Sequence, residues 1–215
     1  KKIKLSHKPV IFDVGANIGV FSLSYATIYR SASVYSFEPV NFIFKILKKN
    51  IKKNTDLEKR IKIFNFGFSN TASHLKLSIP TFKQHKRYGN NNINSGLYSI
   101  HGKGKKKSKA SFISIDNFVK RKNIKKIDFI KIDVEGHEYN VLQGAIKTIN
   151  KFRPIIIFEF NEITKALSKY SYKDYAYLIK KINYRIFGLK YGWADILCPI
   201  KSLKNTQKIS DLVIM

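Results

Sequence analysis

Acidic side chains stand at the ends of several short apolar segments in this chain of 215 residues. Asp13, Glu38, Asp133 and Glu159 each end, or nearly end, a run of residues that is typical of a buried strand. The chain contains only 14 Asp and Glu residues, so their gathering at strand ends is the sharpest functional signal in the sequence. Because ligands of parallel sheets bind beyond the carboxyl ends of the strands, this pattern predicts a pocket for a cationic ligand.

A glycine-containing loop, DVGANIG at residues 13–19, joins the first predicted strand to a helix. Gly15 allows a tight turn, and Gly19 allows close backbone approach and helix packing. The loop lacks the Gly-Lys-Ser/Thr ending of a Walker loop and the G-x-G-x-x-G spacing of dinucleotide-binding folds. With an acid at Asp13, and with Asn17 in place of a glycine, the loop suits a cationic ligand better than a pyrophosphate.

Glu38 stands at the end of the next predicted strand. A carboxylate at this place can accept hydrogen bonds from both ribose hydroxyls of a nucleoside. S-adenosylmethionine is a nucleoside that carries a positively charged centre and no phosphate. We therefore expect this cofactor in the predicted pocket.

Strand-like and helical patterns alternate from the N-terminus onward. The segments expected to be strands are residues 10–14, 34–37, 61–66, 74–79, 111–115, 127–132, 154–160, 184–189 and 212–215. The segments expected to be helices are residues 18–29, 41–54, 116–121, 138–149, 163–168 and 172–181. This alternation predicts a single α/β domain over residues 1–215, with a mostly parallel sheet and helices on both faces. Residues 80–110, rich in Lys and Asn, are expected to form a long insertion loop.

The composition excludes several classes of protein. With 44% hydrophobic and 13% aromatic residues, the chain can build a core and is not intrinsically disordered. Its single cysteine, Cys198, excludes a disulfide framework, and no apolar run approaches the roughly 18–20 residues that a membrane span needs. The basic residues 1–9 do not form a signal peptide, so we expect a cytoplasmic protein. Since residue 1 is not Met, an N-terminal piece is expected to be missing.

The net charge of +27 arises from 41 Lys and Arg residues, of which only six are Arg. Such an excess attracts polyanions, and it leaves open an anionic acceptor or a nucleic acid. Recognition of bases and bidentate binding of phosphate favour Arg. A simultaneous abundance of Lys, Asn and Ile is better explained by a coding bias.

Four segments resemble the FkbM-type methyltransferases: VIFDVGANIGVFSL, YSFEP, IDFIKIDVEGHEYNVLQGA and RPIIIFEF. The similarity covers about residues 10–161, and IKIDVEGHE is its most specific part. The resemblance implies a Rossmann-like sheet of seven strands, the last two forming an antiparallel hairpin. It also implies an enzyme that methylates a hydroxyl group of a sugar, a glycan or a related metabolite.

The resemblance also assigns residues to the cofactor by their position in these motifs. It implies that Asp13, Gly15, Asn17 and Gly19 line the methionine end of the cofactor and that Glu38 holds the ribose. Gly67 and Phe68, after the third strand, fall where such folds contact adenine.

The DVEGHE segment contains the residues that are expected to act in catalysis. Transfer of a methyl group to an alcohol requires removal of a proton, so a base within hydrogen-bond reach is expected. His137 is the first candidate, because a histidine at a helix N-terminus tends to stay neutral, and Glu135 is the second. Asp133, at the end of its strand, could hold the methionine ammonium or orient the acceptor.

A metal-dependent reaction is a less favoured alternative. Glu159 and Asn161 flank Phe160 at the end of the next strand and could chelate a divalent cation together with Asp133. The remaining histidines show no ligand spacing, so no metal site is expected.

A nucleic-acid methyltransferase is the second functional hypothesis. Enzymes that methylate nucleobase nitrogens carry an Asn/Asp-Pro-Pro-aromatic segment where this chain has Asp133-Val134-Glu135-Gly136, which disfavours that class. Methylation of RNA ribose stays open. A nucleic-acid-binding module without catalysis is the third hypothesis, and the intact acids at the strand ends argue against it.

Overall fold

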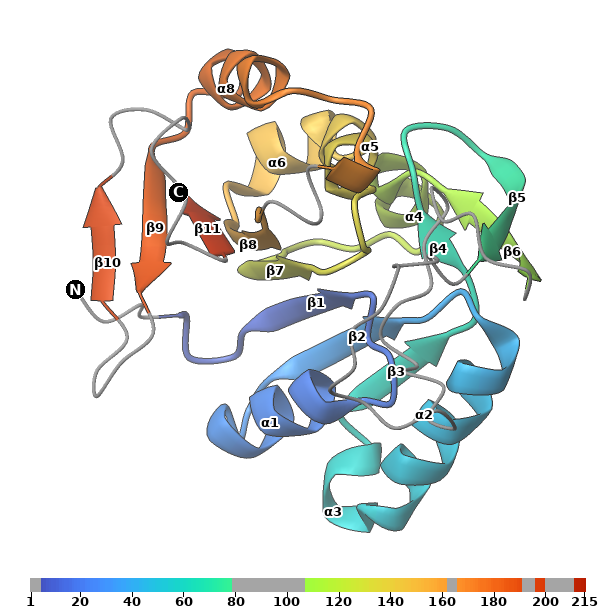
Figure 1. Cartoon of the computed structure of the whole chain (residues 1–215). Coiled ribbons are helices and arrows are strands. Elements are labelled where there is room, and N and C mark those ends of the chain that lie inside the picture. Colours follow the sequence, from blue (N-terminus) through green and yellow to red (C-terminus); the bar gives the residue numbers. More distant parts are fainter. Residues whose placement is uncertain (1–4, 79–106, 162–165, 191–195, 200–210) are drawn as a thin grey trace.

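A computed structural model describes residues 5–78, 107–161, 166–190, 196–199 and 211–215. It contains a large sheet of eight strands and a small sheet of three (Figure 1). In spatial order, the strands of the large sheet are β10 (Ile196–Pro199), β9 (Ile186–Lys190), β11 (Asp211–Ile214), β8 (Ile155–Glu159), β7 (Phe129–Ile132), β1 (Val10–Val14), β2 (Ser33–Phe37) and β3 (Ile61–Phe64).

The pairing of these strands confirms the expected fold. Strands β8, β7, β1, β2 and β3 are parallel, whereas β11 lies antiparallel between β8 and β9. These are the seven strands expected from the sequence. The eighth, β10, extends the sheet by pairing antiparallel with β9.

Helices cover both faces of the large sheet (Figure 1). On one face lie α1 (Val20–Ile28), α2 (Asn41–Lys53) and α3 (Thr55–Glu58), and on the other lie α4 (Ile115–Arg121), α5 (Glu138–Gln143), α6 (Ile146–Phe152) and α8 (Tyr172–Lys181). The two faces follow from the alternation of side chains along each strand. In β1, Ile11 packs in one apolar cluster with Ala26 of α1, and Phe12 packs in the other with Phe118 of α4.

The third strand ends earlier than expected, and residues that follow it belong to the small sheet. That strand ends at Phe64 rather than at residue 66, and Gly67–Phe68 forms β4 of the small sheet. Strand β4 pairs with β6 (Lys107–Ile113), which pairs antiparallel with β5 (Ser73–Ser78). The two strands expected at residues 74–79 and 111–115 are thus present as β5 and β6, with β6 beginning and ending earlier than expected. Residues 107–110 of the expected insertion loop belong to β6, and residues 79–106 lie outside the described part of the chain.

The helix expected over residues 138–149 is two helices, α5 and α6, which are interrupted at Gly144. A side chain at Gly144 would collide with the backbone oxygen of Ser69, 2.2 Å from the position of a Cβ atom. The carboxylate of Asp116 accepts hydrogen bonds from the backbone N–H groups of Lys147 and Thr148. This carboxylate therefore satisfies donors at the start of α6. The helix expected at 163–168 lies partly outside the described residues.

Within the described residues, no helix combines the length and the apolar character that are needed to cross a membrane.

Candidate functional site

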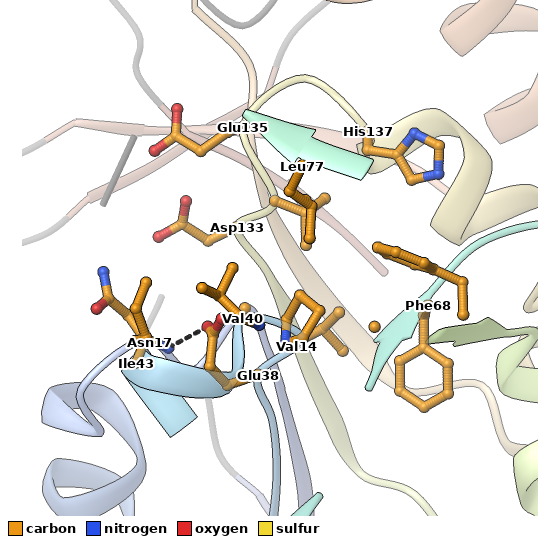
Figure 2. A pocket seen from close by; sticks show the side chains of 15 residues that line it. Val14, Asn17, Glu38, Val40, Ile43, Phe68, Leu77, Asp133, Glu135 and His137 are labelled. Carbon is orange, nitrogen blue, oxygen red and sulfur yellow. Dashed lines mark hydrogen bonds between the residues drawn. The ribbon is translucent and has the colours of Figure 1, made fainter. Parts of the chain in front are cut away.

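A pocket opens beyond the carboxyl ends of β1, β2 and β7 (Figure 2). One wall is polar and contains Asn17, Glu38, Asp133 and Glu135. A second part of the lining, the apolar wall, consists of residues from the start of α2 and from the small sheet: Val40, Ile43, Gly67, Phe68, Leu77 and Phe112. Two sequence segments that were expected to meet, the glycine loop and the DVEGHE turn, therefore share this pocket.

Gly15 brings the glycine loop against the turn that follows β7. Its backbone has φ +82°, and a Cβ atom there would lie 1.8 Å from the backbone oxygen of Asp133. The N–H groups of Gly15 and Ala16 both donate to the carbonyl oxygen of Phe37, at 3.0 and 2.9 Å. The loop is thus tied to both neighbouring strands, and only glycine allows this approach.

Gly19 lies behind the pocket and does not line it. A Cβ atom at Gly19 would lie 2.7 Å from Cδ1 of Leu47. This residue therefore lets the start of α1 pack closely against α2. Asn17, between the two glycines, has φ +50° and contributes to the polar wall.

Glu38 is buried where the glycine loop meets the start of α2. Its Oε2 accepts from the N–H of Asn17 at 3.0 Å, and its Oε1 accepts from the N–H of Val40 at 2.8 Å. Burial raises the pKa of Glu38 to about 7, and the two N–H donors limit the rise. Each carboxylate oxygen keeps a further lone pair that can accept a hydroxyl proton.

Asp13 is fully buried beneath the pocket and is not among the residues that line it. Its Oδ2 accepts from the hydroxyl of Ser22 at 2.5 Å, and its Oδ1 lies 3.8 Å from Nζ of Lys131. Lys131 also donates to Oδ2 of Asp133 at 3.0 Å. Sequence reasoning missed Lys131, although a lysine inside the apolar strand FIKI is a signal of a buried charge.

A strained turn presents Glu135 at the polar wall. Glu135 has φ +53° and Gly136 has φ +92°, and such a conformation costs about 1–3 kcal/mol in a residue other than glycine. The buried carboxylate of Glu138 holds the turn, because its Oε1 accepts from the N–H groups of Val134 and Gly136 at 3.1 and 3.2 Å. Strain that is held in place at a pocket wall is typical of functional sites.

Oxygen atoms of Asp133, Glu135 and Glu159 lie within 4.8 Å of one another. This spacing would allow the three carboxylates to hold one divalent cation. Asn161, the other residue considered for a metal, donates its amide N–H to Glu159 at 2.6 Å. Burial, together with the neighbouring carboxylates, raises the pKa of Glu135 to about 8 and that of Glu159 to about 7.

His137 lies at the apolar side of the pocket, apart from Asp133 and Glu135 (Figure 2). It is buried, and its Nε2 is 3.0 Å from the hydroxyl oxygen of Ser69. Its ring meets the ring of Phe112 edge-on. The structure thus brings Glu135, but not His137, together with Asp133.

Comparison with known proteins finds a family match over most of the chain. Residues 13–186 match the Methyltransferase FkbM domain. The hexuronic acid methyltransferase AglP of Haloferax volcanii is 26% identical over 165 residues, which cover 74% of this chain, and the 31-O-demethyl-FK506 methyltransferase FkbM of Streptomyces tacrolimicus is 26% identical over 161 residues, which cover 66%. The matched region spans 62% of the length of each of these two relatives.

The fold is also similar to the crystal structure of a methyltransferase FkbM from Methylobacillus flagellatus. The TM-score is 0.62 at 17% sequence identity, and the match covers 99% of this chain and 45% of the other. At this identity the similarity supports the fold alone.

Replacing Gly15 by Ala should lower the free energy of unfolding by about 1–3 kcal/mol or more, because a strained φ is combined with a clash against the Asp133 backbone. Urea denaturation measures the loss. Asn123→Ala is the matched control: Asn123 also has positive φ but is exposed and does not line the pocket, so it tests the backbone strain alone. Equal losses in the two variants would contradict the close contact between Gly15 and Asp133.

The stability of the protein should fall as the pH rises from about 5 to 8. Burial raises the pKa of Glu138 from 4.5 to about 8, so the folded state holds a proton over this interval that the unfolded state has released. Stability from this group is complete below pH 4.5 and is lost as the pH rises through about 8. Glu138→Gln cannot titrate and still offers an oxygen to Val134 and Gly136.

Melting temperatures at pH 5 and pH 8 test this expectation. The difference between the two should be smaller in Glu138→Gln than in the wild type, whereas Glu58→Gln, on the exposed helix α3, should keep the wild-type difference. If the difference between the melting temperatures at pH 5 and pH 8 is the same in Glu138→Gln as in the wild type, Glu138 does not carry this proton.

Proposed function

Because the chain belongs to the methyltransferase FkbM domain family, we propose that it transfers a methyl group from S-adenosylmethionine to a hydroxyl group of a sugar, a glycan or a related metabolite. The observation that carries this proposal is the position of Glu38. It is buried, it accepts hydrogen bonds from the N–H groups of Asn17 and Val40, and it lines the same pocket as Asp133 and Glu135. We expect the reaction to take place in the cytoplasm.

The described residues of the pocket fit this cofactor. The apolar wall, with Phe68, Leu77 and Phe112, would take the adenine. Glu38 would accept the ribose hydroxyls, and Asp133 would bind the methionine ammonium. When bound, the cofactor supplies an electrophilic methyl group on a sulfonium centre, whose positive charge is favoured beside these carboxylates.

Glu135 is the base that the geometry supports best. It lies on the polar wall beside Asp133, and its pKa of about 8 makes it a stronger base than an ordinary carboxylate. The turn and Glu138 fix its position, which favours a proton transfer in a defined geometry. His137, preferred from residue type alone, is bonded to Ser69 at the other side of the pocket.

The acceptor class rests on the relatives and on this base. One relative is named for a hexuronic acid and another for an oxygen atom of FK506, so a hydroxyl group on a sugar or a related metabolite is the class we propose. The carboxylate of Glu135 is suited to removing the proton of such a hydroxyl.

Mass spectrometry of a native cell extract, incubated with the protein and a labelled methyl donor, tests the activity and finds the acceptor. Label is expected in small molecules or glycans, and heat-denatured protein serves as the inactive control. A parallel incubation with RNA from the same cells tests the nucleic-acid alternative. Label confined to RNA, or no label beyond the control, would contradict the proposal.

Cofactor affinity should depend on the protonation of Glu38. Its pKa of about 7 implies a carboxylate at pH 8 and mostly a carboxylic acid at pH 6, so affinity for S-adenosylmethionine should be lower at pH 6. Glu38→Gln should bind about tenfold more weakly at pH 8, because a charged acceptor is lost. The difference in affinity between pH 6 and pH 8 should be smaller in this variant, in which Glu135 still titrates. Calorimetry at the two pH values measures both effects, and an unchanged affinity in Glu38→Gln rules out the ribose assignment.

Glu135→Gln should lower turnover by about 10²–10⁴-fold, the range for loss of a general base, and should keep cofactor affinity. His137→Ala should retain turnover within a few-fold and lose stability, since the contact with Ser69 disappears. Turnover is measured with the acceptor found in the extract. A folded His137→Ala protein without turnover would reverse the assignment of the base.

A further inference from the structure

Lys131 is a buried lysine near the middle of the large sheet. It lies in β7 and is 7% exposed. Its Nζ is 3.0 Å from Oδ2 of Asp133 and 3.8 Å from Oδ1 of Asp13. It also lies over the ring of Phe21, 4.2 Å from the ring centroid. One ammonium group thus joins a carboxylate of the pocket wall to a carboxylate beneath it.

Burial of this charge is costly unless it is paired. Burial alone lowers the pKa of Lys131, but the carboxylates of Asp13 and Asp133 outweigh it and raise the pKa. Lys131 therefore stays cationic at neutral pH. The pairing is reciprocal, because Oδ1 of Asp13 is buried without a hydrogen-bond partner among the described residues, and the ammonium of Lys131 is its counter-charge.

Contacts with serine hydroxyls also fix the position of Asp13. Ser22 in α1 donates to Oδ2 of Asp13, and the hydroxyl of Ser22 lies 2.7 Å from that of Ser36 in β2. Asp13 and Lys131 are direct neighbours in the pairing of β1 with β7. A chain of polar contacts therefore runs from α1 and β2 through Asp13 and Lys131 to Asp133.

We propose that Lys131 is a positioning residue for the methyl-transfer site: it holds the carboxylate of Asp133 in place at the pocket wall, and Asp13 anchors Lys131 from behind. The inference rests on the proposed function, since Asp133 is taken to bind the ammonium group of the cofactor. In this inference Asp13 acts on Lys131 and does not contact the cofactor, in agreement with its complete burial.

A double-mutant cycle of Lys131→Met and Asp133→Asn tests whether Lys131 acts through Asp133. Binding of S-adenosylmethionine is measured by calorimetry, and folding is checked by circular dichroism. Each single variant should weaken binding about tenfold, and the double variant should be no weaker than the weaker single, because residues that act as a pair are not additive. Lys131→Arg, which keeps the cation, should restore most of the affinity.

Lys62→Met is the matched control. Lys62 is a strand lysine in β3 that lies over the ring of Tyr35, 5.0 Å from its centroid, and donates to the Tyr35 hydroxyl. It does not line the pocket, so this variant should bind the cofactor like the wild type. If Lys131→Met does not fold, Lys131→Gln repeats the cycle with a neutral donor.

Three results would overturn the inference: wild-type affinity in Lys131→Met, tighter binding in that variant, or a double variant about a hundredfold weaker than the wild type. Tighter binding would mean that Lys131 only repels the cationic cofactor, and additive losses would mean a general structural role. Failure of the wild-type protein to bind S-adenosylmethionine would instead contradict the proposed function as well, so the two failures are distinguishable.

Discussion

The pocket depends on the close approach of two backbone segments that are far apart in the sequence. The glycine loop reaches the carbonyl oxygen of Asp133 because Gly15 has no side chain, and the same loop is tied to the end of β2 through Phe37. This contact places Glu38 and Asp133, which stand on different strands, around one cavity. Each acid alone would be an ordinary strand-end residue, and this approach brings the two to one cavity.

Burial of so many carboxylates needs specific compensation, and the structure supplies it in two different ways. Glu38 and Glu138 each accept two backbone N–H groups, so neutral dipoles hold them. Asp13 and Asp133 are held instead by the charge of Lys131. Despite these contacts, burial raises the pKa of Glu38 to about 7 and that of Glu138 to about 8, as it does for Glu159 and Glu135. The site therefore holds several carboxyl groups that can take up a proton near neutral pH.

The succession of strands and helices along the chain, and the edge of the sheet at which the pocket opens, could be predicted from the sequence, since both follow from local patterns. Alternation of apolar runs with helical segments indicated the parallel sheet, and the strand-end acids indicated the pocket edge. Burial of individual residues could not be predicted: Asp13 faces Ser22 and Lys131 because of the register of β1 with β7, which no local pattern contains. Likewise, the side of the pocket on which His137 lies is set by its contact with Ser69, a residue 68 positions away.

The net charge of the chain and the charge of the pocket have opposite signs, and the pocket is the part that matters for a small cationic ligand. The chain carries +27 overall, yet the residues that line the pocket include Glu38, Asp133 and Glu135, and among the described residues no Lys or Arg is part of that lining. At physiological ionic strength, charges are screened beyond about 8 Å, so exposed lysines farther than this from the cavity contribute little to binding in it. Carboxylates in direct contact are screened much less. The local arrangement of acids, and not the total charge, therefore decides which ligand this pocket attracts.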